Sequence, residues 1–321
     1  EQLHHHRSAA VARIRLALLA GAVVVQLLRM ASLPGAITVS LGRNDLPALT
    51  LSTAAGAQAT VYLQGAHVTS WRAADGVERL FLSSASAFEP GSPIRGGVPV
   101  CWPQFSGRGP LPKHGFARTT EWVIESMAST ADSAEVVLRL SDSEATRAAW
   151  PFSFSLLYTV TLTDASLSMR LEATNTGADP LLFTGALHTY LAVASVQSVS
   201  VAGLGGLTYE DNTAGLALVQ EPAAGRLSIA GEVDRVYLAA PPSLILTYGQ
   251  PSLTYGVGLR VEQQGFRETV LWNIGKARAP GLPDLGEGEW SRYLCLEAAA
   301  AAPVSIPPGA TFIGSQTLTV E

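Results

Sequence analysis

The 321-residue sequence has little charge and almost no cysteine. Charged residues make up only 15% of it and hydrophobic residues 47%, so the chain has ample material for a core and disorder is excluded. The net charge of −5 argues against attraction of the whole protein to nucleic acid. Only two cysteines occur, Cys101 and Cys295, which excludes a disulfide scaffold and any cysteine-based zinc site. Each lies in an apolar run, so two reduced, buried thiols are expected.

Familiar nucleotide-binding and hydrolase motifs are also missing. The sequence has no G-x-G-x-x-G after a strand-like run, no P-loop and no G-x-S-x-G. Its 30 glycines and 19 prolines are spread without a period, which indicates many turns and favours β structure over a helix bundle. The length fits either two domains or one large all-β domain.

The N-terminal residues differ from the rest of the chain. No acidic residue occurs from Gln2 to Asn44, and the apolar stretch from Leu16 to Leu28 would rise only about 20 Å as a helix, against a bilayer core of about 30 Å. A signal-peptide core, an organellar transit segment and an artefact of the sequence all fit. The histidine run His4–His6 is tag-like rather than a metal site. We expect residues 1–44 to be a leader outside the fold, with a cytoplasmic location, or a plastid one if this is a transit segment.

The body of the chain has the pattern of strands. Every even position from Phe152 to Leu162 is apolar, and most odd positions are serine or threonine. A polar turn at residues 163–166 follows, and the alternation resumes from Leu167 to Ala173, which predicts a hairpin. No long helical periodicity appears after residue 45. We therefore predict one large antiparallel β-sandwich over residues 45–321.

Basic and aromatic residues are concentrated between Ile94 and Trp122. The charged residues of this segment are Arg95, Arg108, Lys113, Arg118 and a single acid, Glu121. Converging guanidinium and ammonium groups suit a phosphate or carboxylate, and the interleaved Trp102, Phe105 and Phe116 suit a sugar ring. The simpler alternative is a solvated basic loop.

Two polar residues interrupt apolar strand-like runs. His188 lies in GALHTYL and Glu297 in YLCLEAAA. A lone histidine is more often a core residue with satisfied hydrogen bonds, and a lone carboxylate can belong to a structural ion pair. Burial of a carboxylate is costly, however, and together the two residues would form a general acid–base pair.

Several separated motifs resemble one known family. They are RGGVPVCWPQF (95–105), GPLPKHGFAR (109–118), ALHTY (186–190), EVDRVY (232–237), LWN (271–273) and LCLEAA (294–299). In sequence and order they resemble the hexose-6-phosphate mutarotases, or glucose-6-phosphate 1-epimerases. This branch of the aldose 1-epimerase superfamily includes plant apospory-associated protein C-like sequences. The resemblance extends from about residue 45 to residue 321.

The resemblance implies a β-sandwich of the galactose-mutarotase type and a role for each site residue. His188 would be the general acid and Glu297 the general base of a ring-opening reaction. The substrate-binding residues would be Arg95, Lys113, His114, Arg118 and Asp234, with the cations facing the 6-phosphate and Asp234 the sugar hydroxyls. The expected partner is a hexose 6-phosphate. No cofactor, metal, nucleic acid or membrane is expected for the mature domain, and we expect a monomer.

The sequence departs from the family pattern at a few positions and leaves other functions open. Many relatives have glutamine in place of Lys113, and Ile274-Gly275 replaces a Pro-Trp pair, which affects an aromatic wall of the site. A non-catalytic sugar-phosphate binder and an aldose 1-epimerase for unphosphorylated sugars are the alternatives. A glycosidase would use two carboxylates, for which Glu297 and Asp234 are available.

Overall fold

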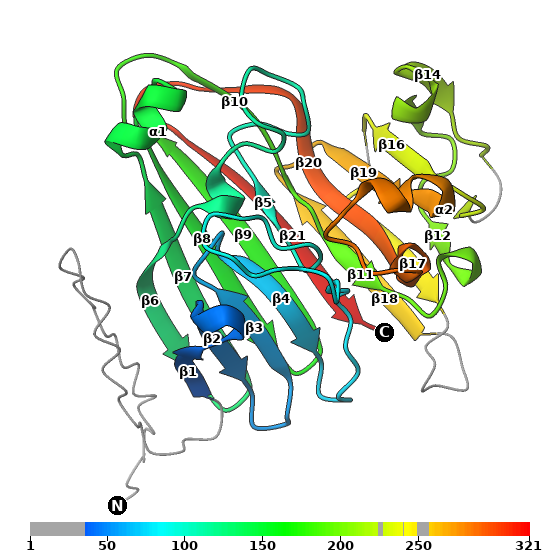
Figure 1. Ribbon diagram of the computed structural model, residues 1–321, viewed down its shortest axis with the longest axis horizontal. Coiled ribbons are helices and arrows are strands. Elements are labelled where there is room, and N and C mark those ends of the chain that lie inside the picture. The colour runs from blue at the N-terminus through cyan, green and yellow to red at the C-terminus, as the bar shows by residue number, and fades with distance from the viewer. Residues whose placement is uncertain (1–35, 224–226, 240, 249–256) are drawn as a thin grey trace, which may run out of the picture.

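The computed structural model describes residues 36–223, 227–239, 241–248 and 257–321. In this part of the chain the strands form three antiparallel sheets (Figure 1). The first contains, in spatial order, β1 (Ala36–Leu41), β2 (Pro47–Ser52), β3 (Gln58–Tyr62) and β4 (His67–Arg72). The predicted all-β sandwich is confirmed.

The two larger sheets contain the remaining strands. The nine-stranded sheet has the order β15 (Leu227–Ser228), β12 (Ser200–Ala202), β17 (Ser243–Tyr248), β18 (Val257–Gln264), β21 (Thr311–Val320), β9 (Ser166–Asn175), β8 (Phe154–Thr163), β7 (Ser133–Ser141) and β6 (Val123–Ser129). The eight-stranded sheet has the order β14 (Ala217–Gln220), β13 (Thr208–Asp211), β16 (Val233–Tyr237), β19 (Glu268–Asn273), β20 (Tyr293–Ile306), β10 (Leu181–Leu187) and β5 (Val100–Cys101), and β11 (Tyr190–Ala192) also pairs with β20.

The helices are short and lie in the connections. They are α1 (Glu144–Ala149), α2 (Gly275–Arg278) and the 3-10 turns η1 (Arg43–Asp45), η2 (Ala117–Thr119), η3 (Val196–Ser198), η4 (Asn212–Ala214), η5 (Ala279–Gly281) and η6 (Glu289–Arg292). In the described part of the chain, no helix has the length and apolar character needed to cross a membrane.

The hairpin predicted from alternating residues is present as β8 and β9. Phe154 pairs with Asn175 and Leu162 with Leu167, and buried residues alternate with partly exposed ones along both strands. The alternation arises because successive side chains of a strand point to opposite faces.

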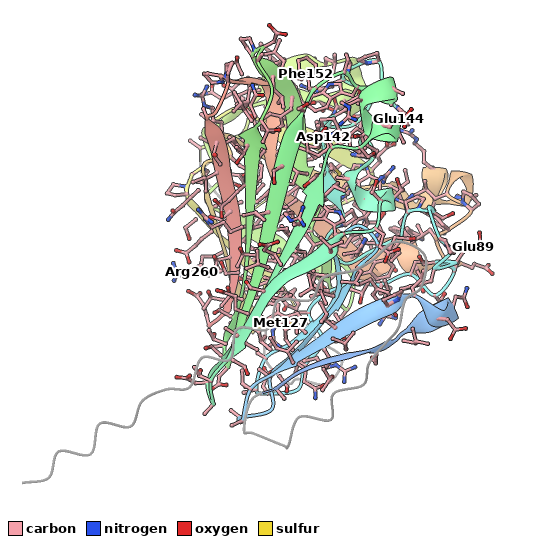
Figure 2. The ribbon with its side chains drawn as sticks, turned by 90° about the vertical axis from the view of Figure 1, so that its left-hand side faces the viewer. Glu89, Met127, Asp142, Glu144, Phe152 and Arg260 are labelled. Carbon is pink, nitrogen blue, oxygen red and sulfur yellow. The ribbon has the colours of Figure 1, made fainter. Side chains whose placement is uncertain are left out.

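One apolar core joins all three sheets. Val61 of β3, Tyr158 of β8 and Leu296 of β20 are fully buried members of the same cluster. The four-stranded sheet leans against β6 and β7 of the nine-stranded sheet, and the side view shows the two converging toward Met127 on β6 (Figure 2).

The fold begins earlier than residue 45. Strand β1 lies within the segment expected to be a leader, yet Ala36 to Leu41 pair with Ser52 to Pro47 of β2 along their whole length. The pattern of this strand escaped detection because it is an edge strand and none of its residues is fully buried. Residues 42–44 of the expected leader are described as well, and η1 begins at Arg43, whereas residues 1–35 lie outside the described residues.

A buried histidine of β4 contacts the backbone at the start of the basic segment, residues 94–122. The His67 ring is fully buried, and its Nε2 lies 2.7 Å from the carbonyl oxygen of Gly96. The next residue, Gly97, has φ +59°, and a Cβ there would lie 2.1 Å from the Val68 carbonyl oxygen. This close approach of two backbones holds the segment that directly follows Arg95 against β4.

Replacement of His67 by glutamine should make the protein less sensitive to acid. Burial lowers the pKa of His67 from 6.5 to about 4, so below pH 6.5 the unfolded chain takes up a proton that the folded chain excludes. Unfolding in urea at about pH 7.5 and about pH 4.5 would measure the effect. Wild-type protein should lose on the order of 2 kcal/mol more stability than His67→Gln between these conditions. Equal losses would contradict a neutral, buried His67.

Candidate active site

The candidate site lies on the face of the eight-stranded sheet that points away from the shared core. Along β20, Leu294, Leu296 and Ala298 belong to that core. Because residues alternate between faces, Cys295 and Glu297 point to the other side. Apolar side chains of the loops, including Phe81, Phe105 and Leu285, pack on this outer face, and Glu297 is only 1% exposed.

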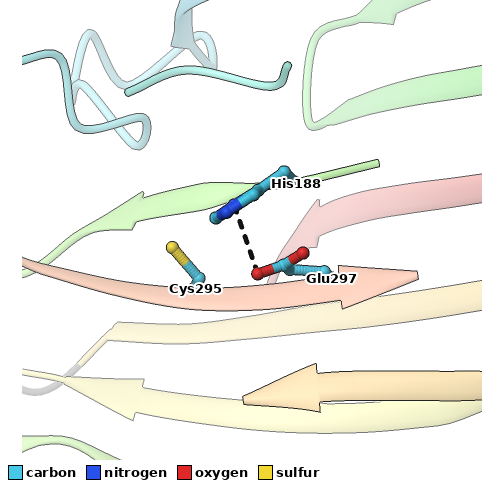
Figure 3. Close-up of side chains that lie close together, drawn as sticks. All are labelled: His188, Cys295 and Glu297. Atoms are coloured by element: carbon cyan, nitrogen blue, oxygen red, sulfur yellow. Dashed lines mark ion pairs between the residues drawn. The ribbon is translucent and has the colours of Figure 1, made fainter. Parts of the chain in front are cut away.

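His188 lies in the short connection between β10 and β11, where the ladder with β20 is interrupted. This position brings its side chain beside Glu297. The backbone N–H of His188 donates to the carbonyl oxygen of Pro99, and the ring turns toward β20. His188 Nδ1 lies 3.2 Å from Glu297 Oε1 (Figure 3). Three rings hold the imidazole: Tyr190 is stacked on it at 4.7 Å, while Trp272 and His114 meet it edge-on.

Burial dominates the electrostatics of this pair. It raises the pKa of Glu297 well above its ordinary value, helped by the negative charge of Asp234 and opposed by Lys113. Burial also lowers the pKa of His188 well below 6.5, helped by His114 and by the cations Arg95, Arg118 and Lys113. The pair therefore favours an uncharged imidazole beside a carboxyl group that holds its proton.

His114 contributes a second, neutral imidazole. Its backbone has φ +71°, followed by Gly115 at +67°, and this turn brings the ring to within 5.3 Å of the His188 ring. Burial and the charges of Arg118, Lys113 and Arg95 lower the pKa of His114 to about 2. Because its Nδ1 accepts a hydrogen bond from the Ser106 N–H, its Nε2 carries the proton and is available as a donor.

Arg95 is tied to the pair through Tyr190. Its guanidinium donates to the Tyr190 hydroxyl at 2.9 Å and makes a two-pronged contact with the Asp284 carboxylate at 3.1 Å. Since Tyr190 is also stacked on His188, a single ring connects the cation to the imidazole.

The other residues singled out in the sequence occupy the surroundings of the pair. Arg118 donates to the Lys113 carbonyl oxygen at 2.9 Å, and its buried Nε has no hydrogen-bond partner among the described residues. Asp234 accepts a hydrogen bond from Asn212 at 2.6 Å. Arg108 points elsewhere, because its guanidinium is paired with Glu210 at 2.6 Å.

Sequence reasoning missed three neighbours of the pair, and it also missed Asp284, the partner of Arg95. Tyr190 and Trp272 lay within the motifs ALHTY and LWN, and Cys295 lies two residues before Glu297, so strand periodicity could have placed each on the site face. Asp284 lies in a glycine- and proline-rich loop and carried no signal. The substituted Ile274 is buried with Phe81 and Tyr190 beside the site, while Trp272 supplies an aromatic face.

The sequence argued against any cysteine-based zinc site, and the structure modifies that conclusion. Among the described residues, Cys295 lies with His188 and Glu297 in a group whose potential ligand atoms are all within 4.8 Å of one another. A single cysteine therefore does have partners of the kind that hold metals.

Comparison with known proteins identifies the class to which this fold and site belong. The family model described as aldose 1-epimerase matches residues 47–319, so the chain belongs to the aldose 1-epimerase family and is an isomerase of the mutarotase class. Among curated relatives, one from Cenchrus ciliaris is 36% identical over 85% of this chain and 84% of its own length. Another, from Escherichia coli K12, is 33% identical over 76% of this chain and 80% of its own. Both carry the name "putative glucose-6-phosphate 1-epimerase".

Solved structures show the same fold. A protein described as a putative mutarotase from Salmonella typhimurium superposes with a TM-score of 0.80 at 28% identity, covering 88% of this chain and 93% of that one. A galactose mutarotase-like protein from Clostridium acetobutylicum gives a TM-score of 0.67 at 13% identity, covering 90% and 99%. The resemblance to this family and fold class is thereby confirmed.

The His188 imidazole should stay uncharged at about pH 6 in the empty protein. Burial and the surrounding cations oppose its protonation, so its pKa lies well below 6.5. Nitrogen-detected NMR of histidine-labelled protein would follow the ring, with His188→Asn identifying its signal. Titration of His188 at its ordinary pKa would show that water reaches the pair and would contradict the buried site.

Proposed function

We propose that this protein interconverts the α and β anomers of hexose 6-phosphates, with His188 as general acid and Glu297 as general base. The observation that carries the proposal is the 3.2 Å contact between His188 Nδ1 and Glu297 Oε1 on the buried outer face of the sheet. Membership of the aldose 1-epimerase family and the names of the relatives support it.

The reaction needs one proton delivered and one removed. His188 donates a proton to the ring oxygen while Glu297 takes the proton of the anomeric hydroxyl, and the bond between C1 and the ring oxygen breaks. The open aldehyde rotates about C1–C2 and closes on its other face, with the two residues exchanging roles. Each turnover restores the starting proton on each residue.

The phosphate would prepare the pair for this exchange. The cations Arg95, Arg118 and Lys113 oppose the protonation of His188. A bound phosphate dianion offsets these charges and so raises the pKa of the imidazole. The proton can then move across the contact from Glu297 to His188, which leaves an acid and a base in the required forms.

The remaining residues fit the other groups of the sugar. Arg95 and Arg118 offer guanidinium donors that suit phosphate oxygens, and Lys113 adds a flexible point charge. The Asp234 carboxylate can accept from sugar hydroxyls, and the His114 Nε2–H can donate to a ring or hydroxyl oxygen. The Trp272 ring beside His188 suits the apolar face of the sugar.

The direct test is anomerisation of freshly dissolved α-glucose 6-phosphate, beside α-glucose, followed by polarimetry or NMR. We expect acceleration of the phosphate ester and little of the free sugar, because only the ester supplies the anion. Equal acceleration would refute the phosphate site and leave an aldose 1-epimerase for unphosphorylated sugars. Folded protein that binds the ester without accelerating its anomerisation would indicate the non-catalytic binder.

Loss of either proton carrier should abolish most of the activity. His188→Asn and Glu297→Gln should each lower kcat by about 10²–10⁴-fold, the usual contribution of general acid–base catalysis, with ligand binding still measurable. The matched control is Glu268→Gln: Glu268 is a buried carboxylate of β19 that accepts from the Ala301 N–H on the same sheet. Equal loss in the control and in Glu297→Gln would argue against a specific base.

Removal of one of the cations should weaken substrate binding. Arg118→Gln should raise KM for glucose 6-phosphate by about tenfold or more, since a hydrogen bond to a charged group is worth about 1.5–3 kcal/mol. Its matched control is Arg139→Gln, which breaks a partly exposed pair with Glu125 on the nine-stranded sheet. An unchanged KM in Arg118→Gln would remove this residue from the phosphate site.

A further inference from the structure

Three potential metal ligands converge at the bottom of the site. A ring nitrogen of His188, the Sγ of Cys295 and a carboxylate oxygen of Glu297 all lie within 4.8 Å of one another. Figure 3 shows the geometry: Cys295 and Glu297 point up from the same face of β20, and the His188 ring approaches them from the opposite side. Alternation along the strand places the two β20 residues together, and the β10–β11 connection supplies the third.

Two atoms of this group have no hydrogen-bond partner in the described part of the chain. They are His188 Nδ1 and Glu297 Oε2, and their residues are only 6% and 1% exposed. Buried polar atoms without partners are costly, so a ligand that both can bind would be stabilised here. The 3.2 Å between His188 Nδ1 and Glu297 Oε1 is close to the separation of two ligands on one tetrahedral ion with bonds of about 2.0–2.1 Å.

The charge of the group suits a divalent ion. A thiolate, a carboxylate and a neutral imidazole together balance a charge of +2, so the occupied site would be neutral and would place no net charge in the protein interior. The mixture of nitrogen, sulfur and oxygen donors favours zinc or cadmium over magnesium or calcium, which prefer oxygen alone.

We propose that His188, Cys295 and Glu297 form an inhibitory site for one zinc-like ion. On binding, the Cys295 thiol and the Glu297 carboxyl group each release a proton to solvent, a metal–sulfur bond forms, and the ion also binds the imidazole lone pair and the carboxylate. With both proton carriers occupied, ring opening stops. The inhibition, though not the binding, rests on the proposed function.

The pH dependence of binding follows from the thiol and the carboxyl group. Burial raises the pKa of Cys295 and that of Glu297 well above their ordinary values. Metal binding must therefore displace both protons, so the apparent affinity rises with pH. The cations Arg95, Arg118 and Lys113 act against the ion, whereas the carboxylate of Asp234 acts for it.

The experiment is a titration of metal-free full-length protein with cadmium, followed by the ultraviolet charge-transfer band of a cadmium–thiolate bond. We expect a band that saturates at one ion per chain. Cys295→Ser should abolish the band and weaken cadmium binding by about tenfold or more. Mutation of a residue that only supports a metal ligand already lowers metal affinity by about 10–100-fold. Cys295→Ala serves as a second variant if serine disturbs folding.

The other cysteine is the matched control. Cys101 is equally buried on the same sheet but does not belong to the group of three, so Cys101→Ser should keep the band. The histidine run His4–His6 is present in every variant and has no thiol, so binding there cannot produce the difference. A missing band in the wild type, or one lost with Cys101 instead of Cys295, would overturn the site.

Activity separates this proposal from the proposed function. Zinc at concentrations that fill the site should suppress anomerisation by wild type and by Cys101→Ser. Removal of the zinc with a chelator such as EDTA should restore the activity. Relative to its own metal-free rate, Cys295→Ser should be inhibited at least about tenfold less effectively. A cadmium band without anomerisation in metal-free protein would refute the function and keep the site. Full activity with the site occupied would refute inhibition.

Discussion

Burial of a carboxylate on the outer face of a β-sheet is the constraint on which the rest of this site depends. Glu297 lies beside apolar residues of β20, and on its own it would face a large desolvation penalty. Within the described part of the chain, the His188 imidazole contacts Glu297 Oε1, and Glu297 Oε2 has no hydrogen-bond partner. This incomplete satisfaction makes the pair receptive to a ligand that can exchange protons with it.

The loops around the pair determine its electrostatic character. Arg95 is already engaged by Asp284 and Tyr190, so its guanidinium is held in place before any substrate arrives. Burial lowers the pKa of His188, and the same cations that suit a phosphate add to this effect. Under the proposed function, anion binding and the proton affinity of His188 are coupled, because an anion that offsets the cations raises the pKa of the imidazole.

The group formed with Cys295 follows from the same geometry. The lone pair and the carboxylate oxygen that the proposed function reserves for a sugar are also the atoms that the proposed metal ion would bind. Serine in place of Cys295 would retain a small polar side chain with much weaker affinity for zinc. The thiol is therefore the feature that would make a proton-transfer site sensitive to such ions.

Much of the fold could be predicted from local patterns. The alternation from Phe152 to Leu162 identified β8 and its hairpin partner, because strand geometry gives side chains a period of two whatever the rest of the chain does. The edge strand β1 gave no such signal and was assigned to the leader, since it buries no complete face. Six motifs were enough to indicate the family, although they could not place the residues between them.

Residues that could carry the chemistry were visible in the linear chain: an imidazole and a carboxylate in apolar runs, and a segment rich in cations. The pairing of both β10 and β11 with β20, which places His188 against Glu297 and beside Cys295, emerged only in the folded chain. Folding also brought Asp284 from a loop without pattern to Arg95. Local geometry repeats along a strand and can be read from it, whereas contacts between distant segments depend on which strands pair and how loops pack over them.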